Sequence, residues 1–129
     1  ISADKRILVA QYMKGQGAGG NTGDPALTLA VPVVQYRNNY LFHAPVNYDS
    51  NFVNVIAPSD QKVLLDGVEI TGFIPIGSTG YSTANLQLFG TNQGNYNITS
   101  EKPFFINVYG YGDYTSYWYP GGLNLIPQK

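Results

Sequence analysis

The chain has 129 residues, the length of one domain, and 43% are hydrophobic, which predicts a folded core rather than disorder. Only 12% are charged and the net charge is −1, which argues against a nucleic-acid partner because such a partner needs a basic surface. The absence of cysteine excludes disulfides and thiolate sites, and a single histidine leaves too few ligands for a zinc site.

The first half of the chain reads as short strands separated by glycine and proline. No window keeps the apolar stripe of an amphipathic helix. Strands are predicted at residues 5–14, 26–35, 39–44, 52–57 and 62–66. The longest apolar stretch, residues 7–10, is far too short for a signal peptide or a membrane span, so we expect no membrane insertion.

The second half continues this pattern. Asp66 and Gly67 lie between two apolar runs, which predicts a two-residue hairpin turn, since both residues tolerate positive φ. Further strands are predicted at 73–76, 81–88, 96–100, 104–109 and 115–119. We therefore expect an all-β fold, an antiparallel β-sandwich of jelly-roll type with about 8–10 short strands. Residues 1–129 are expected to form one such domain.

Residues 15–20 match the glycine pattern of a dinucleotide-binding loop. Such a site needs a helix directly after the glycines, so that backbone N–H groups meet the pyrophosphate. The sequence continues instead with Asn21 to Pro25 and a strand-like run. We therefore expect a flexible loop.

Candidate catalytic and metal-binding side chains are scattered. His43 alternates with Phe42 and is expected to face solvent, without the constellation that catalysis requires. Asp49, Asp60 and Asp113 are weak candidates for calcium, although such residues commonly cap turns. We expect no cofactor, and calcium is the alternative left open. A hydrolase would need two carboxylates that only the fold brings together.

The most distinctive feature is an aromatic cluster at residues 109–120. On a strand, Tyr117 and Tyr119 share one face and Trp118 takes the other, and Tyr109 and Tyr111 share a face. A turn at Gly112 and Asp113 would pair the two arms. Sugars stack on such rings, and cross-strand packing explains the same residues without a ligand. The candidate binding platform comprises Tyr111, Tyr114, Tyr117, Trp118 and Tyr119.

Residues 99–111 and 116–122 resemble the IgGFc-binding family, whose domains close with a Pro-Phe, Val-Tyr-Gly, Ser-Tyr, Tyr-Pro-Gly-Gly succession. Earlier stretches are similar too: residues 4–13, 23–36, 40–45 and 65–67. The lack of cysteine departs from the animal members and resembles bacterial relatives. The resemblance implies a secreted or cell-surface protein, of which this chain would be the C-terminal half of a longer module. It carries no defined catalytic or ligand residues.

Two functions follow as hypotheses. The first is a non-enzymatic, extracellular adhesion or recognition domain for glycans or glycoproteins of a host or neighbouring cell. The alternative is a building block of a surface layer or fibre that self-associates through strand edges or strand exchange. Residues 123–126 are a candidate tail for such exchange.

Overall fold

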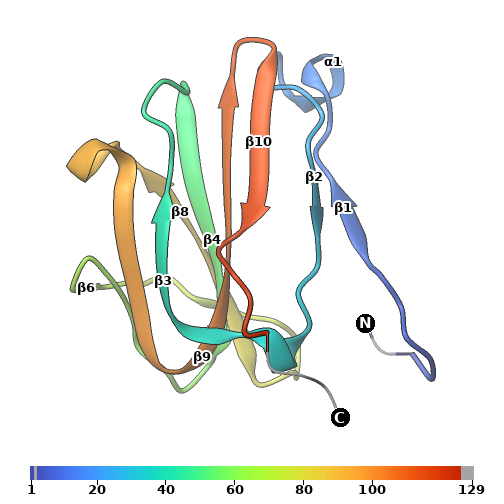
Figure 1. The fold of residues 1–129 in the computed structure, drawn as a ribbon, viewed down its shortest axis with the longest axis vertical. Coiled ribbons are helices and arrows are strands. Elements are labelled where there is room, and N and C mark those ends of the chain that lie inside the picture. Colours follow the sequence, from blue (N-terminus) through green and yellow to red (C-terminus); the bar gives the residue numbers. More distant parts are fainter. Residues whose placement is uncertain (2, 126–129) are drawn as a thin grey trace.

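The structure is a computed structural model that describes residues 1 and 3–125 (Figure 1). Ten strands lie in this part of the chain, together with one α-helical turn and two 3-10 helices. In chain order the elements are β1 (Ala10–Tyr12), α1 (Gln16–Gly19), β2 (Leu27–Leu29), a 3-10 helix (Val33–Gln35), β3 (Arg37–His43), β4 (Ser50–Pro58), β5 (Val63–Leu65), β6 (Val68–Glu69), β7 (Ile74–Pro75), β8 (Tyr81–Leu88), a second 3-10 helix (Thr91–Gly94), β9 (Asn95–Gly112) and β10 (Thr115–Pro120).

Strand β9 organises the fold, because its 18 residues take part in both layers. Its first half pairs with β3 and β5, and β5 also pairs with β6. Its second half pairs with β4 and β10, and the sheet continues through β8 to β7. Every pairing is antiparallel, and the sheet curls over into the two layers of a sandwich. The expected all-β, antiparallel fold is confirmed.

The core lies between the two layers and follows the alternation of the strands. Along β4, every second residue from Asn51 to Ala57 is buried, while the residues between them are half-buried. On β9 the residues that face the same interior are Tyr96, Ile98, Phe104, Ile106 and Val108. The largest fully buried side chains are Tyr40, Val53, Val55, Val63, Ile98, Phe104, Ile106 and Val108.

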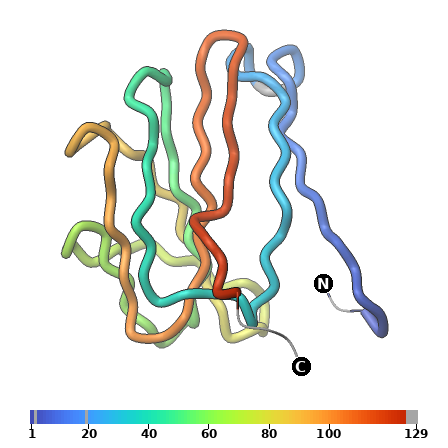
Figure 2. The backbone as a smooth tube through the Cα atoms, in the orientation of Figure 1, coloured from blue at the N-terminus to red at the C-terminus, as the bar shows by residue number. Residues whose placement is uncertain are grey.

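Residues 3–32, here called the N-terminal arm, lie outside the two layers and pack over part of β9 and β10. Its strands β1 and β2 form a separate two-stranded antiparallel sheet, in which Gln11 lies opposite Thr28. The arm follows the β9–β10 hairpin at one end and diverges from the sandwich toward residue 1 (Figure 2). Two hydrogen bonds attach it to this hairpin: Gly23 N donates to Gly112 O at 3.0 Å, and Asp24 N donates to Ser116 Oγ at 2.9 Å.

Several elements differ from their expected form. The long strands predicted at 5–14 and 26–35 shorten to three residues each, since the arm has few neighbours with which to pair. The glycine loop contains the single helical turn α1. The strands predicted at 96–100 and 104–109 are one continuous strand. The last hairpin turns at Asp113 and Tyr114, where Tyr114 takes a positive φ of 52°. No helix in the described residues is long and apolar enough to cross a membrane.

Candidate functional site

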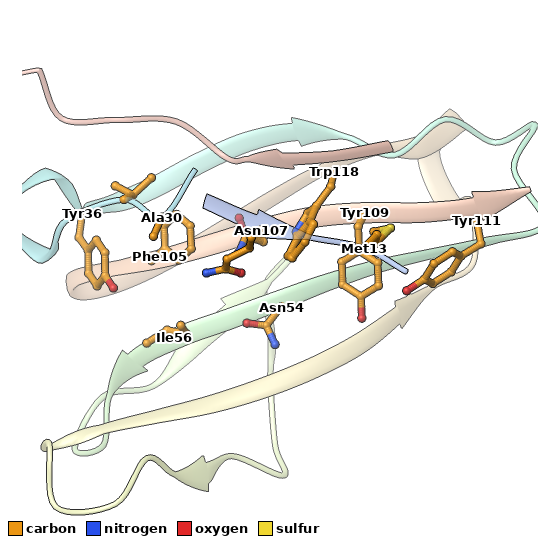
Figure 3. A pocket seen from close by; sticks show the side chains of 12 residues that line it. Met13, Ala30, Tyr36, Asn54, Ile56, Phe105, Asn107, Tyr109, Tyr111 and Trp118 are labelled. Atoms are coloured by element: carbon orange, nitrogen blue, oxygen red, sulfur yellow. The ribbon is translucent and has the colours of Figure 1, made fainter. Parts of the chain in front are cut away.

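The outer face of β9 carries a row of large side chains that point away from the core. Because successive residues of a strand alternate, Phe105, Asn107, Tyr109 and Tyr111 share this face. Figure 3 shows them in a row along β9, with Trp118 beside them. Trp118 of β10 lies beside this row because it is opposite Tyr109 in the β9–β10 ladder.

A pocket of about 350 Å³ lies over this row (Figure 3). The sheet supplies its floor, and the N-terminal arm supplies part of its wall. This volume lies in the range of pockets that hold small ligands. The residues that line it are Gln11, Met13, Ala30, Val31, Tyr36, Asn54, Ile56, Phe105, Asn107, Tyr109, Tyr111 and Trp118.

The aromatic rings of the pocket contact one another and are held by the sheet. The ring of Tyr109 stacks on Phe52 with centroids 5.2 Å apart, and its centroid lies 6.4 Å from that of Trp118. Tyr36 stacks on Phe105 at 5.4 Å. These contacts fix ring orientations before any ligand arrives, which reduces the entropy lost on binding.

The pocket is electrically neutral, since no Asp, Glu, His, Lys or Arg is among its lining residues. Burial raises the pKa of both Tyr36 and Tyr109 above the ordinary value of 10.0. In Tyr109 a hydrogen bond from Asn85 Nδ2, 2.7 Å from the phenol oxygen, partly opposes this rise in pKa. Both phenols are therefore uncharged near neutral pH.

Two buried polar atoms at the pocket have no hydrogen-bond partner within the described residues: Asn107 Oδ1 and Trp118 Nε1. The Asn107 side chain is on a residue only 6% exposed. Two more such atoms, Gln16 Oε1 and Thr28 Oγ1, belong to the N-terminal arm. All four thus lie in the arm or on β9 and β10. Since most buried polar groups in folded proteins are hydrogen-bonded, this region is where a missing partner is expected.

The structure divides the expected aromatic platform between two faces. Tyr111 and Trp118 line the pocket. Tyr117 and Tyr119 lie on the opposite face and pack against the core, where the Tyr117 hydroxyl donates to Asn51 Oδ1 at 2.6 Å. Tyr114 is 72% exposed at the hairpin turn and does not line the pocket. Trp118 thus lies on one face of β10, with Tyr117 and Tyr119 on the other, as the alternation predicted. Ligand binding by the five platform residues stays a prediction.

The structure separates the calcium candidates. Asp49 precedes β4 and Asp113 lies in the β9–β10 turn, so both are at one end of the sandwich. Asp60 follows β4 at the other end, where Lys102 Nζ lies 2.6 Å from its carboxylate and lowers its pKa. Among the described residues, no group of three or more His, Cys, Asp or Glu is placed to hold a metal ion. Calcium binding stays a prediction.

His43 lies on the exposed side of β3, as its alternation with Phe42 predicts. Its Nδ1 lies 3.1 Å from Asn95 Oδ1. No carboxylate of the described residues pairs with it in an ion pair. The contact with Asn95 therefore joins two neighbouring strands, since His43 lies opposite Asn95 in the ladder.

Sequence reasoning did not single out Asn107, which lies at the centre of the pocket. It is the only polar residue in the run from Phe104 to Tyr109. A lone carboxamide in an otherwise apolar strand was the available signal, because a buried polar group requires a partner. Met13 and Val31 carried no such signal, since the arm's position over the sheet is a tertiary feature.

Comparison with known proteins gives one match: the family described as IgGFc binding protein, over residues 1–110. No curated protein and no solved structure matches the chain. The family match includes ten of the twelve pocket residues and ends before Tyr111 and Trp118. It covers most of the chain and agrees with the resemblance of the earlier stretches. The chain belongs to the IgGFc-binding family.

Proposed function

We propose that this domain is a non-enzymatic, extracellular recognition module that serves in adhesion by binding glycans or glycoproteins. The observation that carries the proposal is the neutral, aromatic pocket with its two unpaired buried polar atoms. Aromatic faces suit the apolar C–H faces of sugar rings, and a few placed polar groups fix the orientation of a ligand.

The family supports a binding role rather than a catalytic one, because its name refers to binding of an immunoglobulin Fc region. Pocket chemistry agrees with this choice. Acid–base catalysis needs a titratable group near the operating pH. The pocket lining offers only tyrosines as titratable groups, and burial raises the pKa of two of them.

A glycan array with neutral and acidic structures tests the proposal. We expect the wild type to bind neutral glycans and Trp118→Phe to bind about tenfold more weakly, because phenylalanine keeps a ring but loses one hydrogen-bond donor. Phe89→Ala is the control, since it removes an exposed ring outside the pocket. Absence of glycan binding, or equal loss in both variants, contradicts the proposal.

A second candidate function is self-assembly into a surface layer or fibre. The observation in its favour is the open edge of β1, whose three residues are all exposed and pair on one side only. An open edge can template another strand. The candidate tail shows no strand at Leu123 to Leu125, and Ile126 lies outside the described residues.

Light scattering over a concentration series tests this candidate. Self-assembly predicts a mass that rises with concentration in the wild type and stays monomeric in Tyr12→Lys, which places a charge on the β1 edge. A monomer at every concentration contradicts self-assembly and leaves the recognition function unaffected.

A further inference from the structure

The two unpaired atoms at the pocket are complementary in kind. Asn107 Oδ1 is an acceptor and Trp118 Nε1–H is a donor. In the β9–β10 ladder Asn107 lies opposite Pro120, and Trp118 lies opposite Tyr109. The two side chains are therefore diagonal neighbours on one face, at a backbone separation of about 7–8 Å. A ligand that satisfies both atoms must therefore bring a donor and an acceptor close together.

The neutral lining restricts the charge of that group. A carboxylate, a phosphate or an ammonium ion would lose its hydration there without gaining an opposite charge, since no charged residue lines the pocket. The pocket therefore favours an uncharged ligand.

The unpaired donor and acceptor restrict the ligand further. Much of the lining is apolar or aromatic, including Met13, Ala30, Val31, Ile56 and Phe105. An N-acetylhexosamine keeps the ring hydroxyls of a hexose except the one that its acetamido group replaces, so only the acetamido group distinguishes the two sugars at the unpaired atoms. A secondary acetamide brings one N–H donor, one carbonyl acceptor and an apolar methyl group. Its donor matches Asn107 Oδ1, and its acceptor matches Trp118 Nε1–H.

We propose that the pocket binds the acetamido group of an N-acetylhexosamine, with the sugar ring against the aromatic row. The acetamido N–H donates to Asn107 Oδ1, Trp118 Nε1–H donates to the acetamido carbonyl, and the methyl group contacts the apolar lining. This assignment rests on the proposed recognition function and names its ligand class.

A peptide amide carries the same donor and acceptor, but the position of the pocket favours the sugar. Extended peptides commonly bind by adding a strand to a sheet edge, where successive backbone groups are satisfied. This pocket lies over the face of the sheet, above β4, β9 and β10. The backbone groups of β4 and β9 beneath the pocket are used in ladders on both sides of each strand.

The single tryptophan makes the test direct, because its indole N–H gives one resolved signal in a ¹H–¹⁵N NMR spectrum. The probes are the methyl glycosides of N-acetylglucosamine and N-acetylgalactosamine, the matched glycosides of glucose and galactose, and N-acetylalanine methylamide as a peptide mimic. We expect a saturable shift of the Trp118 signal with at least one N-acetylated sugar. The matched parent sugar is expected to bind about tenfold more weakly or not at all.

Variants connect the signal to the named groups. Asn107→Leu keeps side-chain bulk and removes the acceptor, so N-acetylhexosamine affinity is expected to fall about tenfold or more. Phe89→Ala, which removes an exposed ring outside the pocket, is expected to bind as the wild type does. Because the sugar comparison uses the wild type, it holds even if a variant folds poorly.

The outcomes separate the two proposals. Equal affinity for parent and N-acetylated sugars, or unchanged affinity in Asn107→Leu, overturns the acetamido assignment and leaves glycan recognition standing. A shift with the peptide mimic alone overturns the assignment in favour of a peptide ligand. If neither these sugars nor any glycan on the array binds, both the assignment and the recognition function fail.

Discussion

The two faces of β9 are both covered, but by different chemistry. Its inner face, with Phe104, Ile106 and Val108, lies against apolar side chains of the opposite strands, and all three residues are fully buried. The polar groups on this side have partners: the Tyr40 hydroxyl donates to Phe104 O, and the Tyr117 hydroxyl donates to Asn51 Oδ1. The outer face lies partly under the N-terminal arm and holds a pocket with unpaired polar atoms.

Two asparagines make this difference clear. Asn51 and Asn107 are almost equally buried, at 5% and 6% exposure. Asn51 accepts from Tyr117 and donates through Nδ2 to Pro45 O at 2.9 Å, whereas Asn107 Oδ1 has no partner among the described residues. The inner asparagine therefore stabilises the fold. The outer one costs stability unless a ligand or water binds it.

The largest effect on stability is expected from a substitution on the inner face of β9. Ile106→Ala is expected to lower the free energy of unfolding by about 2–5 kcal/mol, because it leaves a cavity in a core that cannot collapse around it. The matched change on the outer side, Ile56→Ala, is expected to cost about 1 kcal/mol, since this half-buried side chain already borders a pocket. Urea unfolding measures both. Equal losses would contradict the difference between the faces.

A smaller effect is expected where the arm meets the β9–β10 hairpin. Gly23 has a φ of +79°, and a Cβ there would lie 2.6 Å from both Ser116 Oγ and Tyr111 Cδ1. Gly23→Ala is expected to weaken the attachment of the arm to the hairpin by about 1–3 kcal/mol. Limited proteolysis should then cleave residues 3–32 faster while the sandwich stays intact.

Gly17→Ala is the control for this change, since nothing lies within 4 Å of a Cβ at that position and it has no positive φ. It should leave the cleavage rate unchanged. If Gly23→Ala instead unfolds the whole chain, the arm and the sandwich are one cooperative unit and the comparison fails.

Alkaline pH should lower the free energy of unfolding through buried tyrosines on both faces. Burial raises the pKa of Tyr36, Tyr40, Tyr109, Tyr117 and Tyr119 above the ordinary value of 10.0. The unfolded chain ionises first as the pH rises, so this stability is complete below pH 10 and is lost progressively above it. Urea unfolding at a series of pH values measures the loss. An unchanged free energy of unfolding above pH 10 would contradict burial of these phenols.

The sandwich was predictable because local patterns determine most of it. The strand predicted at 81–88 has its observed ends, and Asp66-Gly67 predicted a hairpin turn because both residues tolerate the positive φ that they adopt. The alternation of side chains along a strand predicted that Trp118 and Tyr117 lie on opposite faces of β10.

The pocket was not predictable in the same way. It forms because the arm covers the outer face of a strand that lies about ninety residues later in the chain, through contacts such as Asp24 N to Ser116 Oγ. No local pattern encodes a contact of that sequence separation. Propensity also overestimated the strands predicted at 5–14 and 26–35, because Ile7 and Val34 have strand-forming side chains but lie outside β1 and β2 and remain exposed.

The most direct test of the central claim, that the outer face of β9 is kept for a ligand, is the free energy of unfolding of Asn107→Leu measured beside Asn51→Leu without ligand. Asn51→Leu should lose about 2–3 kcal/mol, because it breaks two hydrogen bonds and leaves their partners unpaired. Asn107→Leu should match the wild type within about 0.5 kcal/mol or exceed it, since an apolar side chain replaces an unpaired acceptor. A loss in Asn107→Leu as large as that in Asn51→Leu would contradict the account.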